Sequence, residues 1–566
     1  MAVILISWCL LGACAIALGL GILGTLRADR ALPDPLDRVA IAAWLGLGTA
    51  ASLSLAVGLF GSVGPWVAPA LLAASAAAAL GWRKLGAACR LSRFQTGCSA
   101  AVLVALTCHA ATVGVDAYDT ALYHQQAVSW LSHFGVVKGL AWLHFRLGSS
   151  SSWFALGAAL NHGILAGRVS PILGGLAIAL GALHWLLTLD RAALRKARPS
   201  DWYLLFTYPI LLAAAWSWHY DVSLGPDLPA WILCALAVWV VLALRPAGAG
   251  FGALSIPFLM ASLASSFKFS MLPLLPLTLP LPLLAAKGRA PSRWARLVTL
   301  AACSLPVLTT MAANTKTAGC PLYPSAVGRI PTEWAVPASF ARLVSHETTE
   351  FARWHGVEKR QTAWPLSWVR RKDQAALLVL ALAGALLLIR RAMAERSRFV
   401  LWVLATGTAG LAFLFWGAPN PRFGLSFFLL FPATALALAA GHRQFGLVRL
   451  RPAVLFLVVA SICAGVLSSD LRTRQSHPLD ALANRWLLPQ PMPGENGAAV
   501  HVFNRAANHW AELRANTAVN GNLHFLMPVG SDQCWDLPLP CTPQIIDRGF
   551  RLRDRTAGLS GGFAAR

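Results

Sequence analysis

Long apolar stretches are the feature that most limits the folds open to this chain. The hydrocarbon core of a bilayer is ~30 Å thick and requires ~20 mostly apolar residues per helix. About fourteen such stretches can be placed along the sequence. They lie near residues 2–24, 39–59, 64–80, 98–115, 169–189, 201–220, 228–244, 250–267, 269–286, 297–313, 374–389, 399–417, 423–441 and 452–468. None alternates apolar and polar residues as barrel strands do, so we predict an all-α polytopic membrane protein with about fourteen transmembrane helices.

Composition and the placement of charge agree with a membrane location. Only 12% of the 566 residues are charged and 57% are hydrophobic, whereas an ordinary soluble domain is about 25% charged. The net charge of +24 would suggest nucleic acid in a soluble protein, but here basic residues gather in short loops between apolar stretches. These loops are 83–93, 191–198, 287–296 and 390–398. Such loops are typical of the cytoplasmic side. We therefore predict a bacterial inner (cytoplasmic) membrane protein without a nucleic-acid partner, whose other loops face the periplasm.

Residues 153–167 test this topology because they resemble one more crossing. At ~1.5 Å per residue the stretch is short for a span, and counting it would move a basic loop to the outer side. We therefore expect a periplasmic interfacial helix here, with both the N-terminus and the C-terminal tail outside. The first apolar stretch lacks a basic n-region and a clear cleavage site, so we expect it to be a retained helix.

Three regions of the chain differ in character. Residues 1–97 predict accessory transmembrane helices with few polar residues, and residues 98–468 alternate helices with polar outer loops. Residues 469–566 are polar and contain no stretch long enough to span, so we expect a small periplasmic C-terminal domain. Cys534 and Cys541 lie in this tail and can form a disulfide in an oxidising compartment.

The stretch VDAYDTALYHQQ places two acids, Asp116 and Asp119, at the end of an apolar run. If the following segment is helical, Asp119, Tyr123, Gln126 and Trp130 share one polar and aromatic face. A carboxylate on that face could take a proton from an acceptor hydroxyl. The alternative is that either acid only caps the helix, which is a common role for Asp.

Basic residues beside two other apolar stretches suggest anion binding. Lys268 lies in SSFKFS and Arg422 in GAPNPRF. A lone cation there can anchor a helix by reaching toward water, or can bind a phosphate on a polyprenyl chain. The planar guanidinium of Arg422 suits a phosphate. Asp116, Asp119 and His124 could hold a divalent metal ion, but their spacing is not specific, so no cofactor is expected.

Several motifs resemble those of a known class of membrane enzymes. An acid followed four residues later by tyrosine in DTALY is similar to the first outer loop of GT-C glycosyltransferases, and GPDLP is similar to their second acidic loop. YDTALYHQQAVSW, GLAWLHFRLGSSSSWF, SFKFS, GCPLYPS and PNPRFG more closely resemble an uncharacterised family of bacterial polytopic membrane proteins, distantly related to GT-C enzymes. The resemblance covers about residues 98–430.

The resemblance implies a GT-C-like fold and a glycosyltransferase that moves a sugar from a polyprenyl-phosphate donor to a hydroxyl acceptor. The acceptor would belong to an envelope glycan, lipid or protein at the periplasmic face. Asp119 would be the general base, with Asp116 or Asp227 as the assisting acid. Lys268 and Arg422 would hold the donor phosphate and stabilise charge on the leaving group. The substrate pocket would be lined by Tyr123, His124, Tyr323, Asn420 and Arg146. The class has a strict Asp-Asp or Asp-Glu pair where this chain has DAYD, which leaves open whether Asp116 or Asp119 is the base.

The alternative function is a transporter or flippase of a lipid-linked glycan. It would need polar residues near the bilayer midplane and broken helices there. The proline-rich stretch 272–283 favours it, whereas the clustering of acids on one side and the lack of an internal repeat do not. A scaffold of an envelope-polysaccharide assembly is a third interpretation.

Overall fold

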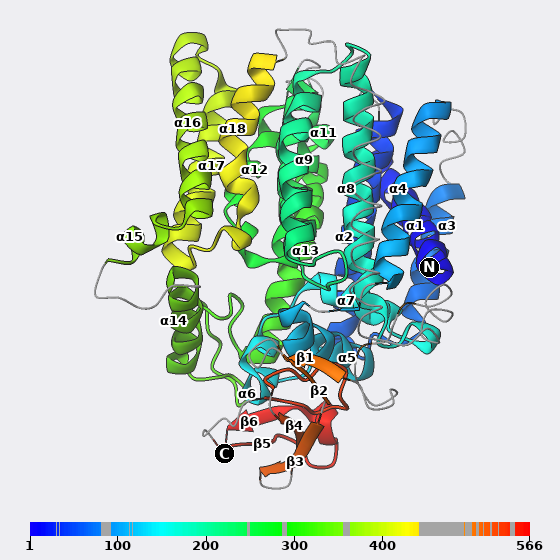
Figure 1. The fold of residues 1–566 in the computed structure, drawn as a ribbon, viewed down its shortest axis with the longest axis vertical. Helices are drawn as coiled ribbons and strands as arrows, with labels where there is room; N and C mark the ends of the chain where they lie inside the picture. Colours follow the sequence, from blue (N-terminus) through cyan, green and yellow to red (C-terminus); the bar gives the residue numbers. More distant parts are fainter. Residues whose placement is uncertain are drawn as a thin grey trace.

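The structure is a computed structural model of the chain. It describes all residues except 30, 33, 81–91, 113, 116, 246–248, 286–290, 355–362, 441–488, 490–491, 493–500, 505–508, 513, 521–522, 530, 544–548 and 566. Figure 1 shows a bundle of helices along the long axis of the molecule, with a small group of strands at one end. The predicted span at 452–468 and the predicted domain boundary at 468 lie outside the described residues.

Helices form most of the described chain up to residue 440. The longer ones are α1 (Ala2–Thr25), α2 (Pro35–Phe60), α3 (Val67–Leu80), α4 (Arg93–Thr112), α8 (Val169–Ala193), α9 (Pro199–Ser217), α10 (Asp227–Leu244), α11 (Phe251–Phe267), α13 (Arg293–Ala318), α14 (Ala338–Trp354), α16 (Lys372–Glu395), α17 (Arg398–Gly417) and α18 (Leu425–Ala440). The shorter ones are α5 (Gln125–Phe134), α6 (Leu140–Leu143), α7 (Ser152–Leu160), α12 (Leu274–Thr278) and α15 (Trp364–Val369). Single turns of 3-10 or π-helix are η2 (Thr120–His124), η3 (Phe145–Gly148), η4 (Gly163–Leu165), η6 (Phe269–Met271), η7 (Leu281–Leu284), η8 (Pro421–Phe423) and η9 (Gly558–Gly561).

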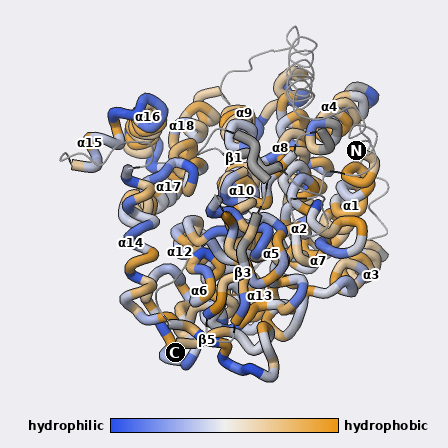
Figure 2. The backbone as a smooth tube through the Cα atoms, turned by 60° about the horizontal axis from the view of Figure 1, so that its bottom comes forward, coloured by the Kyte–Doolittle hydropathy of each residue, from blue (hydrophilic) through white to orange (hydrophobic). Residues whose placement is uncertain are grey.

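Seven of the described helices are long and apolar enough to cross a membrane, namely α1, α2, α8, α10, α13, α16 and α17. Figure 2 shows hydrophobic residues along much of the length of the helices. Shorter apolar helical stretches accompany them at Val67–Ala79, Gln95–Thr107, Phe251–Phe267, Leu274–Leu284 and Leu425–Ala440. The chain is therefore a multi-pass helical membrane protein. The expected number of about fourteen spans is not shown by the part of the chain that the structure describes.

Two predicted segments differ from continuous spanning or surface helices. The stretch near 269–286 breaks into η6, α12 and η7. Its prolines lack the backbone N–H and their rings clash with the preceding turn, which interrupts a helix. The helix α7 is too short to span, as expected, but the side chains from Ser152 to Ala159 are all buried. An apolar sequence on every face of α7 leads it to pack inside the protein, against α2 and α5.

The helices α1 and α2 pack closely at two glycines. A Cβ atom at Gly19 would lie 1.8 Å from the Ala42 carbonyl oxygen, and one at Gly46 would lie 1.8 Å from the Ala15 carbonyl oxygen. Close backbone approach through small residues is typical of contacts between membrane helices, because lipid supplies no hydrophobic drive for association.

Replacing Gly46 by Val is expected to lower the free energy of unfolding by about 3 kcal/mol, because the added methyl groups meet a backbone carbonyl that cannot rotate away. Thermal unfolding of the purified protein in detergent measures the change. Gly12→Val is the matched control, since a Cβ at Gly12 on α1 would have no heavy atom within 4 Å. Equal losses for the two variants would contradict a tight contact at Gly46.

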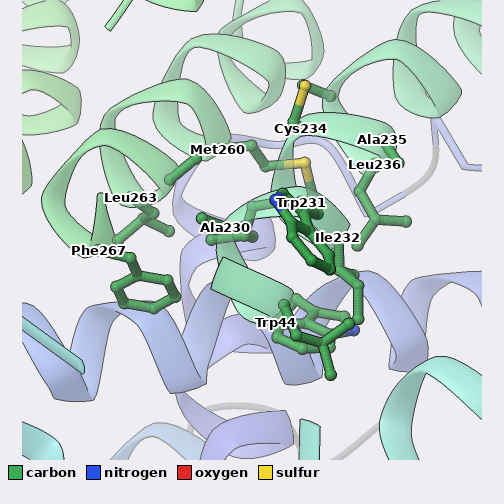
Figure 3. Close-up of a cluster of buried hydrophobic side chains, with 14 of the residues drawn as sticks. Trp44, Ala230, Trp231, Ile232, Cys234, Ala235, Leu236, Met260, Leu263 and Phe267 are labelled. Atoms are coloured by element: carbon green, nitrogen blue, oxygen red, sulfur yellow. The ribbon is translucent and has the colours of Figure 1, made fainter. Parts of the chain in front are cut away.

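The helix α10 lies at the centre of the bundle. Every residue from 221 to 240 is buried, which includes most of α10. Figure 3 shows Trp231 of α10 close to Trp44 of α2 and to Met260 of α11. Because its residues are buried on all sides, this part of α10 has no face toward lipid or water. The residue at which α10 begins, Asp227, is therefore held by the core of the protein.

The C-terminal region is built from short antiparallel hairpins. The strand β1 (His501–Asn504) pairs with β2 (His509–Glu512), β3 (Arg514–Asn520) with β4 (Leu523–Val529), and β5 (Phe550–Leu552) with β6 (Phe563–Ala565). Figure 1 places them beside α5 and α6, where the Phe563 N–H donates to the Lys138 carbonyl (2.9 Å). The protein is thus mostly helical with a small strand-containing region, and not all-α.

Candidate functional site

Four charged side chains from distant parts of the sequence meet at one end of the bundle. Asp119 precedes η2, and Asp227 is the first residue of α10. Lys268 follows the last residue of α11, and Arg422 lies in η8. The ion pairs are Asp119 with Arg422, Arg422 with Asp227, and Asp227 with Lys268. We call these four residues the ion-pair network.

The ion-pair network lies at the opposite end of α10 from a cluster of basic residues. Arg245 follows α10, and its guanidinium lies 5.2 Å from the ring centroid of Phe399, near the start of α17. The 18 residues of α10, at ~1.5 Å each, separate Arg245 from Asp227 by about 27 Å. The network and the basic loop at 390–398 therefore belong to opposite faces of the bundle.

Asp227 is the most enclosed member of the ion-pair network. Its side chain is 1% exposed. One carboxylate oxygen accepts from the Lys268 ammonium. The other accepts from the Tyr220 hydroxyl at 2.9 Å and from Arg422 Nε at 3.3 Å. The positive end of the α10 dipole also favours an anion at this position. Asp227 therefore anchors both cations of the network.

Arg422 is held by its backbone and by an aromatic ring. Its N–H donates to Asn420 Oδ1 at 3.0 Å, and its carbonyl accepts from Trp231 Nε1 at 3.1 Å. The guanidinium lies 5.7 Å from the centroid of the Tyr220 ring, a favourable cation–π arrangement. Asn420 thus lies beside Arg422 and orients its backbone within the turn.

Asp119 is bound to the network by one partner. Its carboxylate accepts from Arg422 Nη2 and makes no capping bond to the turn that follows. The Asp119 side chain therefore does not cap this helical turn. Burial would raise the pKa of the Asp119 carboxyl, but the positive charges of Arg422 and Arg146 outweigh it and hold this pKa below its usual range.

Lys268 is the cation most affected by its surroundings. Its ammonium lies 4.4 Å from the centroid of the Phe423 ring and pairs with Asp227. Burial, followed by repulsion from Arg422, lowers the pKa of Lys268 well below its usual value. Lys268 is thus the member of the network that can lose its charge most readily.

Aromatic side chains and a third cation surround Asp119. The ring centroid of Tyr123 lies 4.4 Å from that of His124, and the Arg146 guanidinium lies 5.5 Å from the Tyr123 ring. Burial lowers the pKa of His124 to about 3, and burial raises that of Tyr123 to about 12, so both are neutral at pH 7. Within the described residues, the Arg146 guanidinium takes part in no ion pair. Arg146 therefore adds a positive charge to the site, close enough to help lower the pKa of Asp119.

Two predicted site residues are not placed with the ion-pair network. Asp116 lies outside the described residues. Tyr323 packs in a hydrophobic cluster that Tyr123 also contacts, where its ring lies beside Gly148, and its hydroxyl has no hydrogen-bond partner among the described residues. Tyr220 and Phe423, by contrast, touch the network and were not predicted. No sequence pattern assigned a role to Tyr220 or Phe423, although each lies close in sequence to a predicted residue. Their roles are seen only in the structure, where their rings lie beside Arg422 and Lys268.

The C-terminal region reaches the segment that carries Asp119. The N–H of Trp535 donates to the Ala121 carbonyl at 2.8 Å. Gln126 donates to the carbonyls of Trp535 (3.0 Å) and Leu537 (2.9 Å), and the Tyr118 hydroxyl donates to Asp532. These bonds hold the turn after Asp119 against a loop more than 400 residues away in the sequence.

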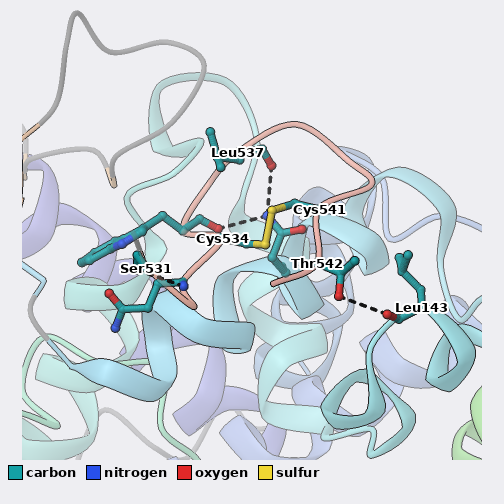
Figure 4. Close-up of a disulfide and its surroundings, with 9 residues drawn as sticks. Leu143, Ser531, Cys534, Leu537, Cys541 and Thr542 are labelled. Atoms are coloured by element: carbon teal, nitrogen blue, oxygen red, sulfur yellow. Dashed lines mark hydrogen bonds between the residues drawn. A yellow bond between two sulfur atoms is a disulfide. The ribbon is translucent and has the colours of Figure 1, made fainter. Parts of the chain in front are cut away.

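A disulfide between Cys534 and Cys541 closes this loop. Figure 4 shows it beside the Thr542 hydroxyl, which donates to the Leu143 carbonyl at 3.1 Å. The disulfide therefore lies next to two attachments of the C-terminal region, the contacts of Trp535 with Gln126 and of Thr542 with Leu143.

Replacing both cysteines by Ser is expected to destabilise the loop by about 2.5 kcal/mol, the value for a closed segment of this length. Amide hydrogen exchange should then become faster at residues 531–542 and at the contacting residues 118–126. The buried helix α10 is the internal reference. Unchanged exchange at 118–126 would show that the loop does not hold this segment.

No group of three or more His, Cys, Asp or Glu side chains suited to a metal ion occurs within the part of the chain that the structure describes. The chemistry of the site, as described, comes from two carboxylates, three cations, and aromatic rings.

The fold and the site define a polytopic helical membrane protein with a charged site at one end of its bundle. Residues 1–429 match the model of a family described as a domain of unknown function (DUF8201), and the chain belongs to this family. No curated protein matches the sequence. No solved structure matches it either.

Proposed function

We propose that the protein is a glycosyltransferase that moves a sugar from a polyprenyl-phosphate donor to a hydroxyl acceptor of an envelope glycan, lipid or protein. The observation that carries the proposal is the meeting of Asp119, Asp227, Lys268 and Arg422 at one end of the bundle. Sugar transfer of this kind needs a base for the acceptor hydroxyl and cations for the phosphate that leaves. Both kinds of group are present within one network.

In this proposal each residue has a distinct role. Asp119, the more exposed carboxylate, receives the proton of the acceptor hydroxyl, while Asp227 positions the two cations. Lys268, Arg422 and Arg146 bind the donor phosphate. Tyr123 and His124, both neutral, line the sugar pocket, and Tyr323 lies in the hydrophobic cluster that Tyr123 contacts.

The orientation of the protein follows from the charge of its loops. Basic loops favour the cytoplasm, and the network lies at the opposite end of α10 from Arg245 and the loop at 390–398. We therefore propose that the site faces the periplasm of a bacterial inner membrane. A GT-C-like fold with about fourteen spans would account for the remaining apolar helices.

A lipid-linked glycan transporter is favoured by one observation, the broken segment η6, α12 and η7. The charges of the ion-pair network, however, gather at the end of α10 and not along its length, where a transport path would need them. Sugar transfer accounts better for this arrangement.

A transfer assay tests the proposal. Purified protein in detergent is incubated with radiolabelled sugars on polyprenyl phosphate and with hydroxyl acceptors from envelope extracts. Time-dependent movement of label to an acceptor is expected. Flipping of the donor across the bilayer of proteoliposomes, without transfer, would favour the transporter instead.

A further inference from the structure

The two carboxylates of the ion-pair network are bound very unequally. Asp227 accepts from Lys268, Tyr220 and Arg422, and its side chain is 1% exposed. The Asp119 side chain is 18% exposed, and its partner in the network is Arg422 alone. If one carboxylate gives up its cation to another anion, it is Asp119.

The backbone at Asp119 also leaves its carboxylate free to turn. Asp119 stands at the start of a π-helical turn, a feature frequent at functional sites. Its side chain makes no bond to that turn, so no capping interaction would have to break. The orientation of the carboxylate in this structure therefore depends on Arg422.

Of the five charged side chains described around Asp119 and Asp227, three are positive and two are negative. Asp119 and Asp227 contribute two negative charges, whereas Arg422, Lys268 and Arg146 contribute three positive ones when Lys268 is protonated. A surplus of this sign raises the local concentration of anions. Arg422 is the cation that such an anion would share with Asp119, because a guanidinium can bind a phosphate through two parallel bonds.

We propose that Asp119 occupies the place of an anionic ligand, and that a phosphate head group entering the site takes over Arg422 and releases the Asp119 carboxylate. The proposal rests on the proposed function for the identity of the head group. Asp227 keeps its bonds to Lys268 and Tyr220 during this exchange, so the cation frame stays in place. Arg146 supplies the first attraction for the phosphate.

The exchange would couple donor binding to the basicity of Asp119. Once Arg422 turns to the phosphate, Asp119 keeps its buried surroundings but loses its strongest opposite charge. Burial without this opposite charge favours the protonated form of the carboxyl, so the pKa of Asp119 rises toward its usual range. The carboxylate then accepts a proton more readily at the time when the donor is bound.

Phosphate binding without a sugar tests this exchange directly. Full-length wild type and Asp119→Asn are titrated with a polyprenyl monophosphate in detergent, by isothermal calorimetry. Asp119→Asn is expected to bind about tenfold more tightly, since the carboxylate that competes for Arg422 is gone. Arg422→Gln is expected to bind at least about tenfold more weakly. Asp373→Asn, an exposed acid at the start of α16, is the control and should match wild type.

Equal or weaker binding by Asp119→Asn would overturn the proposal, as would the absence of binding to wild type and variant alike. Asp119→Ala serves in place of Asp119→Asn if the Asn variant does not elute as a folded monodisperse protein.

Inorganic phosphate forms a second arm of the titration. Tighter binding of inorganic phosphate by the variant shows that the phosphate alone drives the exchange, and tighter binding of the lipid only shows that the chain is also needed. Tighter binding by the variant, together with no sugar transfer by wild type, would refute the proposed function alone. Sugar transfer by wild type without tighter binding by the variant would refute the exchange alone.

Discussion

Replacing Asp119 by Asn is expected to lower the rate of sugar transfer by about 10²–10⁴-fold, which is the usual contribution of a positioned general base. The amide cannot accept the proton of the acceptor hydroxyl, although it has nearly the shape of the carboxylate. The loss should appear in kcat, and the KM for the donor should not rise, because Arg422 and Lys268 remain to bind its phosphate. Initial rates with labelled donor measure both quantities.

The control for this experiment is Asp373→Asn, which removes an exposed carboxylate at the start of α16. Its rate should equal that of wild type. Equal turnover by wild type and Asp119→Asn would remove Asp119 from the mechanism. Asp116→Asn would then be the variant to measure, since the motif DAYD offers two acids.

Replacing Asp227 by Ala is expected to lower the free energy of unfolding by about 3–5 kcal/mol, the usual cost of removing one partner from a buried ion pair. Asp227 binds Lys268, Arg422 and Tyr220 from the first residue of the central helix. Its loss leaves Lys268 and Arg422 close together without the carboxylate between them. A drop in the midpoint of thermal unfolding in detergent checks the change.

A second variant separates charge from packing in this result. Asp227→Ala combined with Lys268→Met should be more stable than Asp227→Ala alone, because one of the two unbalanced cations is then absent. Asp373→Asn should leave the midpoint unchanged. No recovery in the double variant would mean that the lost volume, and not the unbalanced charge, destabilises Asp227→Ala.

The nature of the chain and several site residues could be predicted from local features. Long apolar stretches alone indicate membrane helices, because a bilayer requires their length and composition. Asp119, Asp227, Lys268 and Arg422 were notable because charges are costly beside such stretches. The break at 269–286 followed from its prolines, although its place among the other helices did not.

Other parts of the site could not be predicted because they depend on contacts between distant segments. Tyr323 was expected in the pocket; its ring packs beside Gly148, and its hydroxyl makes no hydrogen bond to the ion-pair network among the described residues. Tyr220 and Phe423 were not expected, and their roles arise from the stacking of Arg422 and Lys268 on their rings. The strands of the C-terminal region, and their attachment to the turn after Asp119, carried no signal in hydropathy.

By itself, the sequence determined that this protein is a multi-pass helical membrane protein with polar residues concentrated in certain loops, because hydropathy and helix breaking are local properties. Only the tertiary structure decided that the Asp119 carboxylate pairs with Arg422, 303 residues away. That choice depends on tertiary packing, which brings the residue before η2 against η8, the turn that precedes α18. The side chains at these turns then balance their charges with whichever partners the packing brings within reach.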